Sequence, residues 1–123
     1  MLLRTCAAAL GAALLASCAS LNNRPEIDWQ HGARHGVVAG FYTPETAMDM
    51  LPECLSRMPK ATLAERHFVS VRYRHVRHHA YAVVEVADVR PLSIGMEVEV
   101  LPDDCAHDQF GRIVRILSAT PQP

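Results

Sequence analysis

The chain has 123 residues, and its 12 Lys and Arg nearly balance its 13 Asp and Glu, for a formal net charge of -1. This length has room for one domain, and the balance of charge excludes a wholly polybasic nucleic-acid-binding protein. Half of the residues are apolar, which excludes a fully disordered chain.

The N-terminal segment, residues 1–17, is predicted to be a signal helix. Its first four residues, MLLR, carry one positive charge, and residues 5–16 are uncharged and almost wholly apolar. These are the n-region and the h-region of a secretory signal peptide. A retained transmembrane helix is the alternative, although the apolar run is shorter than the roughly 20 residues that such a helix needs.

The apolar run ends in Leu15-Ala16-Ser17-Cys18, which resembles the lipobox of bacterial lipoproteins. The resemblance implies cleavage before Cys18, attachment of two fatty acyl chains such as palmitate through its sulfur, and acylation of the new amino group. By resemblance to enterobacterial sorting, Ala19 after the lipidated Cys favours the outer membrane. Since two or three acyl chains anchor a protein stably, we expect a lipid-anchored protein that faces the periplasm. An ordinary cleaved signal peptide with an incidental Cys is the alternative.

The four cysteines are expected to have three different fates. Cys6 leaves with the signal peptide and Cys18 carries the lipid, so Cys54 and Cys105 remain in the mature chain. Two cysteines in a small exported domain predict a disulfide, and the alternative is a pair of buried free thiols. The sequence contains no C-x-x-C motif, so nothing indicates a thioredoxin-like redox role.

The mature chain divides into a tether, a domain and a tail. Residues 18–32 are polar and aperiodic, which predicts a lipidated, flexible tether. Residues 33–118 are expected to form the domain, and residues 119–123 a frayed tail. The sequence TPE at residues 43–45 has the order of a helix N-terminus, so a short helix is expected before Pro52.

Five short strands are expected in the domain, at residues 37–42, 68–73, 81–89, 96–101 and 113–117. These segments are rich in β-branched residues or alternate between apolar and polar side chains. Because the edges of a sheet must be closed or covered, the expected fold is mainly β: a small five-stranded SH3-like or OB-like barrel with a short helix. A meander with one packed helix is the alternative.

Two of these strands alternate clearly enough to assign their faces. In the second, Val69, Val71 and Tyr73 are expected to be buried, whereas the residues between them, Ser70, Arg72 and Arg74, are expected to face solvent. In the fourth, Glu97 and Glu99 are expected to share the solvated face.

Residues 81–117 resemble the C-terminal part of bacterial outer-membrane lipoproteins of the rickettsial surface-antigen, glycine-zipper type. The matching residues are Val84 and Val86, Leu92 to Gly95, Val98-Glu99-Val100, and Arg112-Ile113-Val114. The long Gly-rich apolar hairpin of that family is missing here. The chain has only Gly32, Gly36 and Gly40 at four-residue spacing, a segment too short and too charged to span a bilayer. In a strand these glycines would share one face, at a point of close approach.

Basic side chains gather where the second and third strands are expected to form a hairpin. We call these six residues the Arg/His hairpin: Arg72, Arg74, His75, Arg77, His78 and His79. They predict a binding surface for an anionic ligand or partner, and a solvated basic loop is the alternative. Imidazoles also bind Zn, Ni or Cu, but the neighbouring arginines oppose a cation and no Cys lies nearby, so no metal site is predicted.

No arrangement of residues predicts catalysis. The serines have no G-x-S-x-G context, and no Gly-rich loop could hold a phosphate. We therefore expect no enzyme, no cofactor and no nucleic-acid partner. The expected function is a structural or interaction role in the cell envelope, with the membrane, an envelope protein or lipopolysaccharide as partner. The alternative is a small binding module that takes an anionic ligand or a metal through the Arg/His hairpin.

Overall fold

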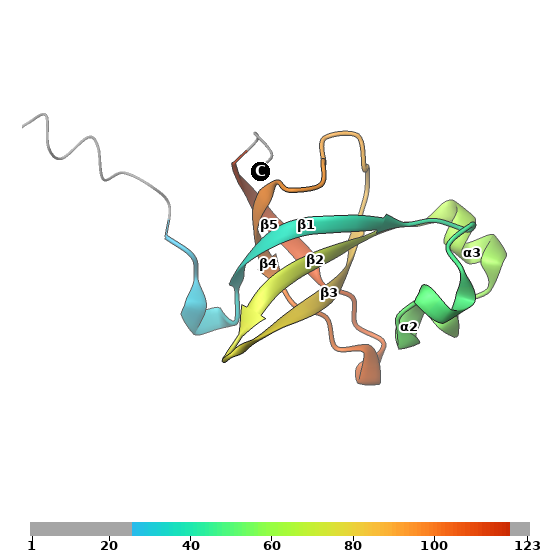
Figure 1. Cartoon of the computed structure of the whole chain (residues 1–123), viewed down its shortest axis with the longest axis horizontal. Coiled ribbons are helices and arrows are strands. Elements are labelled where there is room, and N and C mark those ends of the chain that lie inside the picture. Colours follow the sequence, from blue (N-terminus) through green and yellow to red (C-terminus); the bar gives the residue numbers. More distant parts are fainter. Residues whose placement is uncertain (1–25, 119–123) are drawn as a thin grey trace, which may run out of the picture.

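The computed structural model describes residues 26–118 (Figure 1). The predicted signal helix, the lipidation site Cys18, the first part of the predicted tether and the tail at 119–123 lie outside the described residues. Within residues 26–118, no helix has both the length and the apolar character needed to cross a membrane.

The described chain forms one antiparallel sheet of five strands with short helices beside it. The strands are β1 (Arg34–Tyr42), β2 (His67–His75), β3 (His78–Val86), β4 (Glu97–Leu101) and β5 (Arg112–Ser118), in the spatial order β3-β2-β1-β4-β5. The helices α2 (Glu53–Ser56) and α3 (Lys60–Glu65) lie between β1 and β2. Three 3-10 turns complete the fold: η1 (Trp29–His31), η2 (Met48–Met50) and η3 (Cys105–His107). The prediction of a mainly β domain with five strands and little helix is confirmed.

The helices begin at prolines rather than at the predicted Thr43. Pro52 is the N-cap of α2 and Pro59 is the N-cap of α3. A proline is tolerated at the start of a helix because the first N–H groups have no partner within the helix. The segment before Pro52, where a helix was expected, contains only the single turn η2.

The sheet curls but does not close into a barrel. At its two edges, one isolated parallel bridge joins Val84 of β3 to Gly111, which directly precedes β5. There Gly111 N–H donates to the Val83 carbonyl at 2.8 Å, and Glu85 N–H donates to the Gly111 carbonyl at 3.2 Å. Only glycine fits this crowded position without displacing a neighbour, because a Cβ on Gly111 would lie 3.1 Å from Cγ2 of Val84 and 2.7 Å from the Leu101 carbonyl oxygen. The expectation that the sheet closes into an SH3-like or OB-like barrel is therefore wrong: the five strands form one open sheet.

The sheet has an apolar cluster on each face. The inner cluster lies within the curl and contains Val38, Val69, Val71, Ala82, Val84, Leu92, Met96, Val98 and Val100. The outer cluster forms where α2 and α3 cover the strands, and contains Cys54, Leu55, Leu63, Phe68 and Val83. The inward position of Val69 and Val71 is confirmed. The expectation that Ser70 faces solvent is wrong: Ser70 is buried, since the opposite face of β2 is also covered at this point.

Gly36 and Gly40 differ in their surroundings, because the pairing of β1 with β2 is irregular between Val38 and Gly40. A Cβ on Gly36 would lie 2.5 Å from Cγ1 of Val71, whereas a Cβ on Gly40 would meet nothing within 4 Å. Gly32 has a φ of 88° and ends η1. The expectation that the three glycines share one closely packed face is therefore correct for Gly36 alone.

Gly36→Ala is expected to lower the free energy of unfolding by about 2 kcal/mol, the cost of overpacking a well-filled core. Gly40→Ala is the matched control and is expected to be neutral or slightly stabilising, since it restricts the unfolded chain without a clash. Urea denaturation of both variants measures the difference. Equal stabilities of the two variants would contradict the close packing at Gly36.

Candidate anion-binding surface

The Arg/His hairpin is a regular two-stranded hairpin at one end of the sheet. Arg74 pairs with His79 and His75 pairs with His78, so only Val76 and Arg77 form the turn. Val76 has a φ of 56°, in the left-handed region that two-residue hairpin turns require. The six residues of the Arg/His hairpin are all exposed. The predicted pairing of the second and third strands is confirmed.

The six side chains do not converge on one point. Strand alternation places Arg72, Arg74 and His79 on the outer face, whereas His75 and His78 belong to the inner face, beside Tyr73. The ring of His75 meets the ring of Tyr73 edge to face, with 6.5 Å between the centroids. Within residues 26–118, no group of three His, Cys, Asp or Glu side chains could hold a metal ion.

The three arginines of the Arg/His hairpin differ from several other arginines in having no acidic partner among residues 26–118. Arg57 lies 3.5 Å from Asp108, Arg66 pairs with Glu85, Arg90 lies 2.8 Å from Asp88 and Arg115 lies 2.7 Å from Glu99. In the part of the chain that the structure describes, no ion pair involves Arg72, Arg74 or Arg77. The hairpin therefore presents positive charge that the domain itself does not neutralise.

The buried carboxylate of Glu99 ties the start of the described chain to the sheet. Glu99 is only 2% exposed, and one of its oxygens lies 2.7 Å from Nη2 of Arg115, its cross-strand neighbour. The other oxygen accepts a hydrogen bond from the Asp28 N–H at 3.2 Å. Arg115 also donates to the Glu26 carbonyl. The expectation that Glu99 is solvated is wrong, because residues 26–28 hydrogen-bond to this pair.

The bidentate pair of Arg66 and Glu85 stabilises the junction between α3 and the sheet, and no local sequence pattern indicates it. Nη2 of Arg66 donates to Oε1 of Glu85 at 2.9 Å, and Nε donates to Oε2. The guanidinium carbon lies 5.2 Å from the ring centroids of both Phe68 and Phe110. The hydrogen bond from Arg66 lowers the pKa of Glu85, against the opposing effect of desolvation.

Glu85→Gln is expected to lower the free energy of unfolding by about 1 kcal/mol at neutral pH, since it removes the charge that Arg66 binds. Because the folded-state pKa of Glu85 is depressed below the ordinary 4.5, its contribution is present above that value and is lost as the pH falls through the folded-state pKa. The difference in free energy of unfolding between the parent and Glu85→Gln should therefore become smaller in acid. Denaturation at several pH values measures it, with Glu65→Gln, an exposed glutamate of α3, as the control. If the difference in free energy of unfolding between the parent and Glu85→Gln stayed constant as the pH fell, the stabilising role of the ionised Glu85 would be contradicted.

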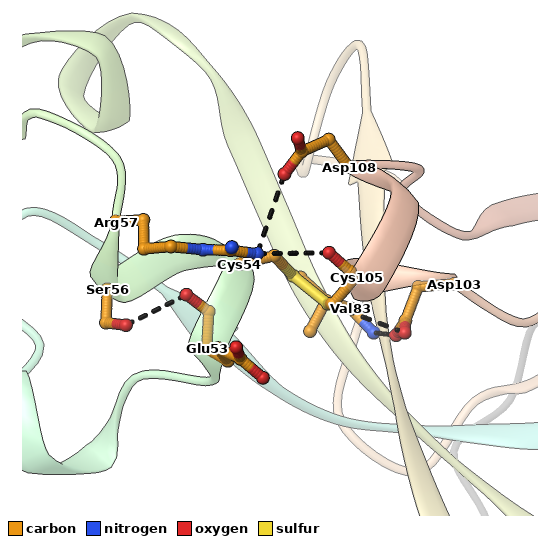
Figure 2. The surroundings of a disulfide bond; sticks show 8 residues. All are labelled: Glu53, Cys54, Ser56, Arg57, Val83, Asp103, Cys105 and Asp108. Carbon is orange, nitrogen blue, oxygen red and sulfur yellow. Dashed lines mark hydrogen bonds and ion pairs between the residues drawn. A yellow bond between two sulfur atoms is a disulfide. The ribbon is translucent and has the colours of Figure 1, made fainter.

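The disulfide, drawn in Figure 2, involves α2, which lies at the far end of the sheet from the turn between β2 and β3 in Figure 1. It joins Cys54 of α2 to Cys105 of η3, whose Cα atoms are 5.1 Å apart, a separation that a disulfide can span. Figure 2 shows Arg57 extending from α2 toward the same segment, where it donates to the Cys105 carbonyl at 3.0 Å. Asp103 accepts a hydrogen bond from the Val83 N–H. These contacts hold the connection between β4 and β5 against α2 and β3.

Comparison with known proteins found no matching family, no matching curated protein and no matching solved structure. The resemblance of residues 81–117 to the rickettsial surface-antigen lipoproteins therefore stays a prediction.

Proposed function

We propose that this chain is a lipid-anchored lipoprotein of the bacterial cell envelope, anchored through Cys18, and that its β domain is an interaction module. The signal-peptide pattern of residues 1–17 and the lipobox-like sequence before Cys18 support the anchor. The Arg/His hairpin is the proposed binding surface, and an anionic component of the envelope is its proposed partner. The outer membrane is the proposed location, with the domain in the periplasm.

One observation carries the choice of the Arg/His hairpin: Arg72, Arg74 and Arg77 are exposed and lie outside every ion pair of the described residues, whereas Arg57, Arg66 and Arg115 pair with acids. An arginine without an internal partner retains its full capacity to bind an anionic group. Metal binding through the same hairpin is less well supported, because its histidines are divided between the two faces of the sheet.

Cys18→Ala is expected to move the protein from the membrane fraction to the soluble fraction, since it removes the acyl chains that give stable anchoring. Fractionation of cells that express the parent or the variant, together with mass spectrometry of the N-terminal peptide, measures both location and acylation. Cys6→Ala is the matched control, because Cys6 lies within the predicted signal peptide. A Cys18→Ala variant that still fractionates with membranes would refute the proposed anchor.

A further inference from the structure

The start of β1 and the turn of the Arg/His hairpin lie at the same end of the sheet. Gly36 of β1 is opposite Tyr73 of β2 in an antiparallel pair, so η1, which directly precedes β1, is close to the end of β2. Figure 1 shows η1 beside the turn between β2 and β3, with α2 and α3 at the far end. The start of the described chain is held there, since Asp28 donates to Glu99 and Arg115 donates to Glu26.

The sequence distance to the proposed anchor is short. Cys18 precedes Glu26 by eight positions, and eight residues span at most about 28 Å even when fully extended. A lipid on Cys18 would therefore keep Glu26 within about one domain diameter of the bilayer. The short connection from Cys18 to Glu26 therefore joins the domain at the end that carries η1 and the hairpin turn.

This end carries the side-chain types that bind the headgroup region of a membrane. Arg74 and Arg77 supply unpaired positive charge, and His75, His78 and His79 adjoin them. Trp29 is 57% exposed, and the guanidinium of Arg34 lies 5.8 Å from its ring centroid. Tryptophan and arginine are both favoured at membrane–water interfaces.

Val76 at the turn is the most unusual residue of this end. It is 79% exposed and has a φ of 56°, a backbone conformation that a β-branched residue rarely adopts. A polar residue or glycine would suit a solvated turn better, on both conformational and solvation grounds. An apolar side chain at this tip is explained if the tip lies against the apolar edge of the headgroup layer.

We infer that Trp29, Arg74, Val76 and Arg77 form a membrane-contact surface that binds the anionic phospholipid headgroups of the leaflet holding the anchor. This inference rests on the proposed function, since the anchor at Cys18 supplies the proximity. Each arginine near an anionic surface strengthens binding about fivefold. Two arginines therefore strengthen it about 25-fold, enough to decide how a tethered domain is oriented.

Trp29 is the only tryptophan of the chain, so its fluorescence reports this contact directly. The acylated full-length protein would be reconstituted into phosphatidylcholine vesicles with or without phosphatidylglycerol, both containing brominated phosphatidylcholine as a quencher. We expect at least twofold stronger quenching of Trp29 when phosphatidylglycerol is present, and loss of that difference at high salt because the attraction is screened. Equal quenching in the two kinds of vesicle would overturn the inference.

A charge-matched pair of variants separates the surface from a general charge effect. Arg74→Glu with Arg77→Glu is expected to abolish the extra quenching, whereas Lys60→Glu with Arg90→Glu, which changes the net charge equally, is expected to retain it. All four positions are exposed, and circular dichroism verifies that both variants fold. If both double variants lost the extra quenching to the same extent, the inference would be overturned.

The failure of the anchor and the failure of the surface give different results. A mature chain without acyl groups by mass spectrometry refutes the proposed function, and charge-dependent quenching by phosphatidylglycerol vesicles would still support the surface. If the chain is acylated but the quenching of Trp29 does not depend on phosphatidylglycerol, the membrane-contact surface is refuted and the proposed anchor is not. A photo-crosslinker at Val76 that forms adducts with a protein rather than with phospholipid in intact cells would also overturn the inference.

Discussion

Replacing both Cys54 and Cys105 by Ala is expected to lower the free energy of unfolding by about 4 kcal/mol, the chain-entropy value for a loop of this length. The two cysteines are 51 positions apart, so the disulfide closes a loop that includes α2, α3 and the strands β2 to β4. Small domains have total stabilities of about 5–15 kcal/mol. The variant is therefore expected to be partly unfolded at physiological temperature, and guanidinium denaturation measures the loss.

Reduction of the parent protein is the complementary experiment for the disulfide. A thiol reductant should destabilise the parent by a similar amount and leave the double variant unchanged, because the variant has no disulfide to lose. Alkylation of both Cys54 and Cys105 in the native, unreduced protein would show that the disulfide is not formed. In that case, any loss of stability in the double variant would come from changed core packing, because Cys54 is buried.

Arg115→Met is expected to lower the free energy of unfolding by about 3 kcal/mol, because it leaves a buried carboxylate without its partner. Glu99 is 2% exposed and Arg115 supplies its counter-charge from the neighbouring strand. The double variant Glu99→Gln with Arg115→Met is expected to recover most of this loss, since no buried charge then remains. Arg112→Met, at an exposed arginine of the same strand, is the control and should change stability by less than about 0.5 kcal/mol.

The Glu99–Arg115 pair should also control the start of the described chain. Arg115 donates to Glu26, and Asp28 donates to Glu99, so Arg115→Met is expected to speed amide hydrogen exchange at Asp28. Exchange at Asp28 that is unchanged in Arg115→Met, or a double variant as unstable as the single one, would contradict the role assigned to this pair.

The strands were predictable because their signals are local. Alternation at Val69 and Val71 identified the inner face of β2, and the same pattern at Val98 and Val100 identified that of β4. The Arg/His hairpin could be located for the same reason, since its two strands are adjacent in the sequence and need only a two-residue turn. The division of its histidines between two faces follows from that pairing.

The burial of Glu99 was not predictable from the local pattern. Alternation places Glu99 on the same face as Glu97, and that face would be solvated if nothing covered the strand. Its polar contacts in the fold come from Arg115 and from Asp28, which is 71 positions away. A period-two pattern reports which side of a strand a residue occupies, and it carries no information on what else lies against that side.

By itself, the sequence determined the mainly β class, the approximate strands and the basic hairpin, because each depends on neighbouring residues. Only the tertiary structure decided which charges remain free. Ion pairs such as Arg57–Asp108 and Arg115–Glu99 join different elements of the fold, so only the folded chain brings their members together. Within residues 26–118, the arginines of the Arg/His hairpin take part in no ion pair, so their positive charge stays available to a partner.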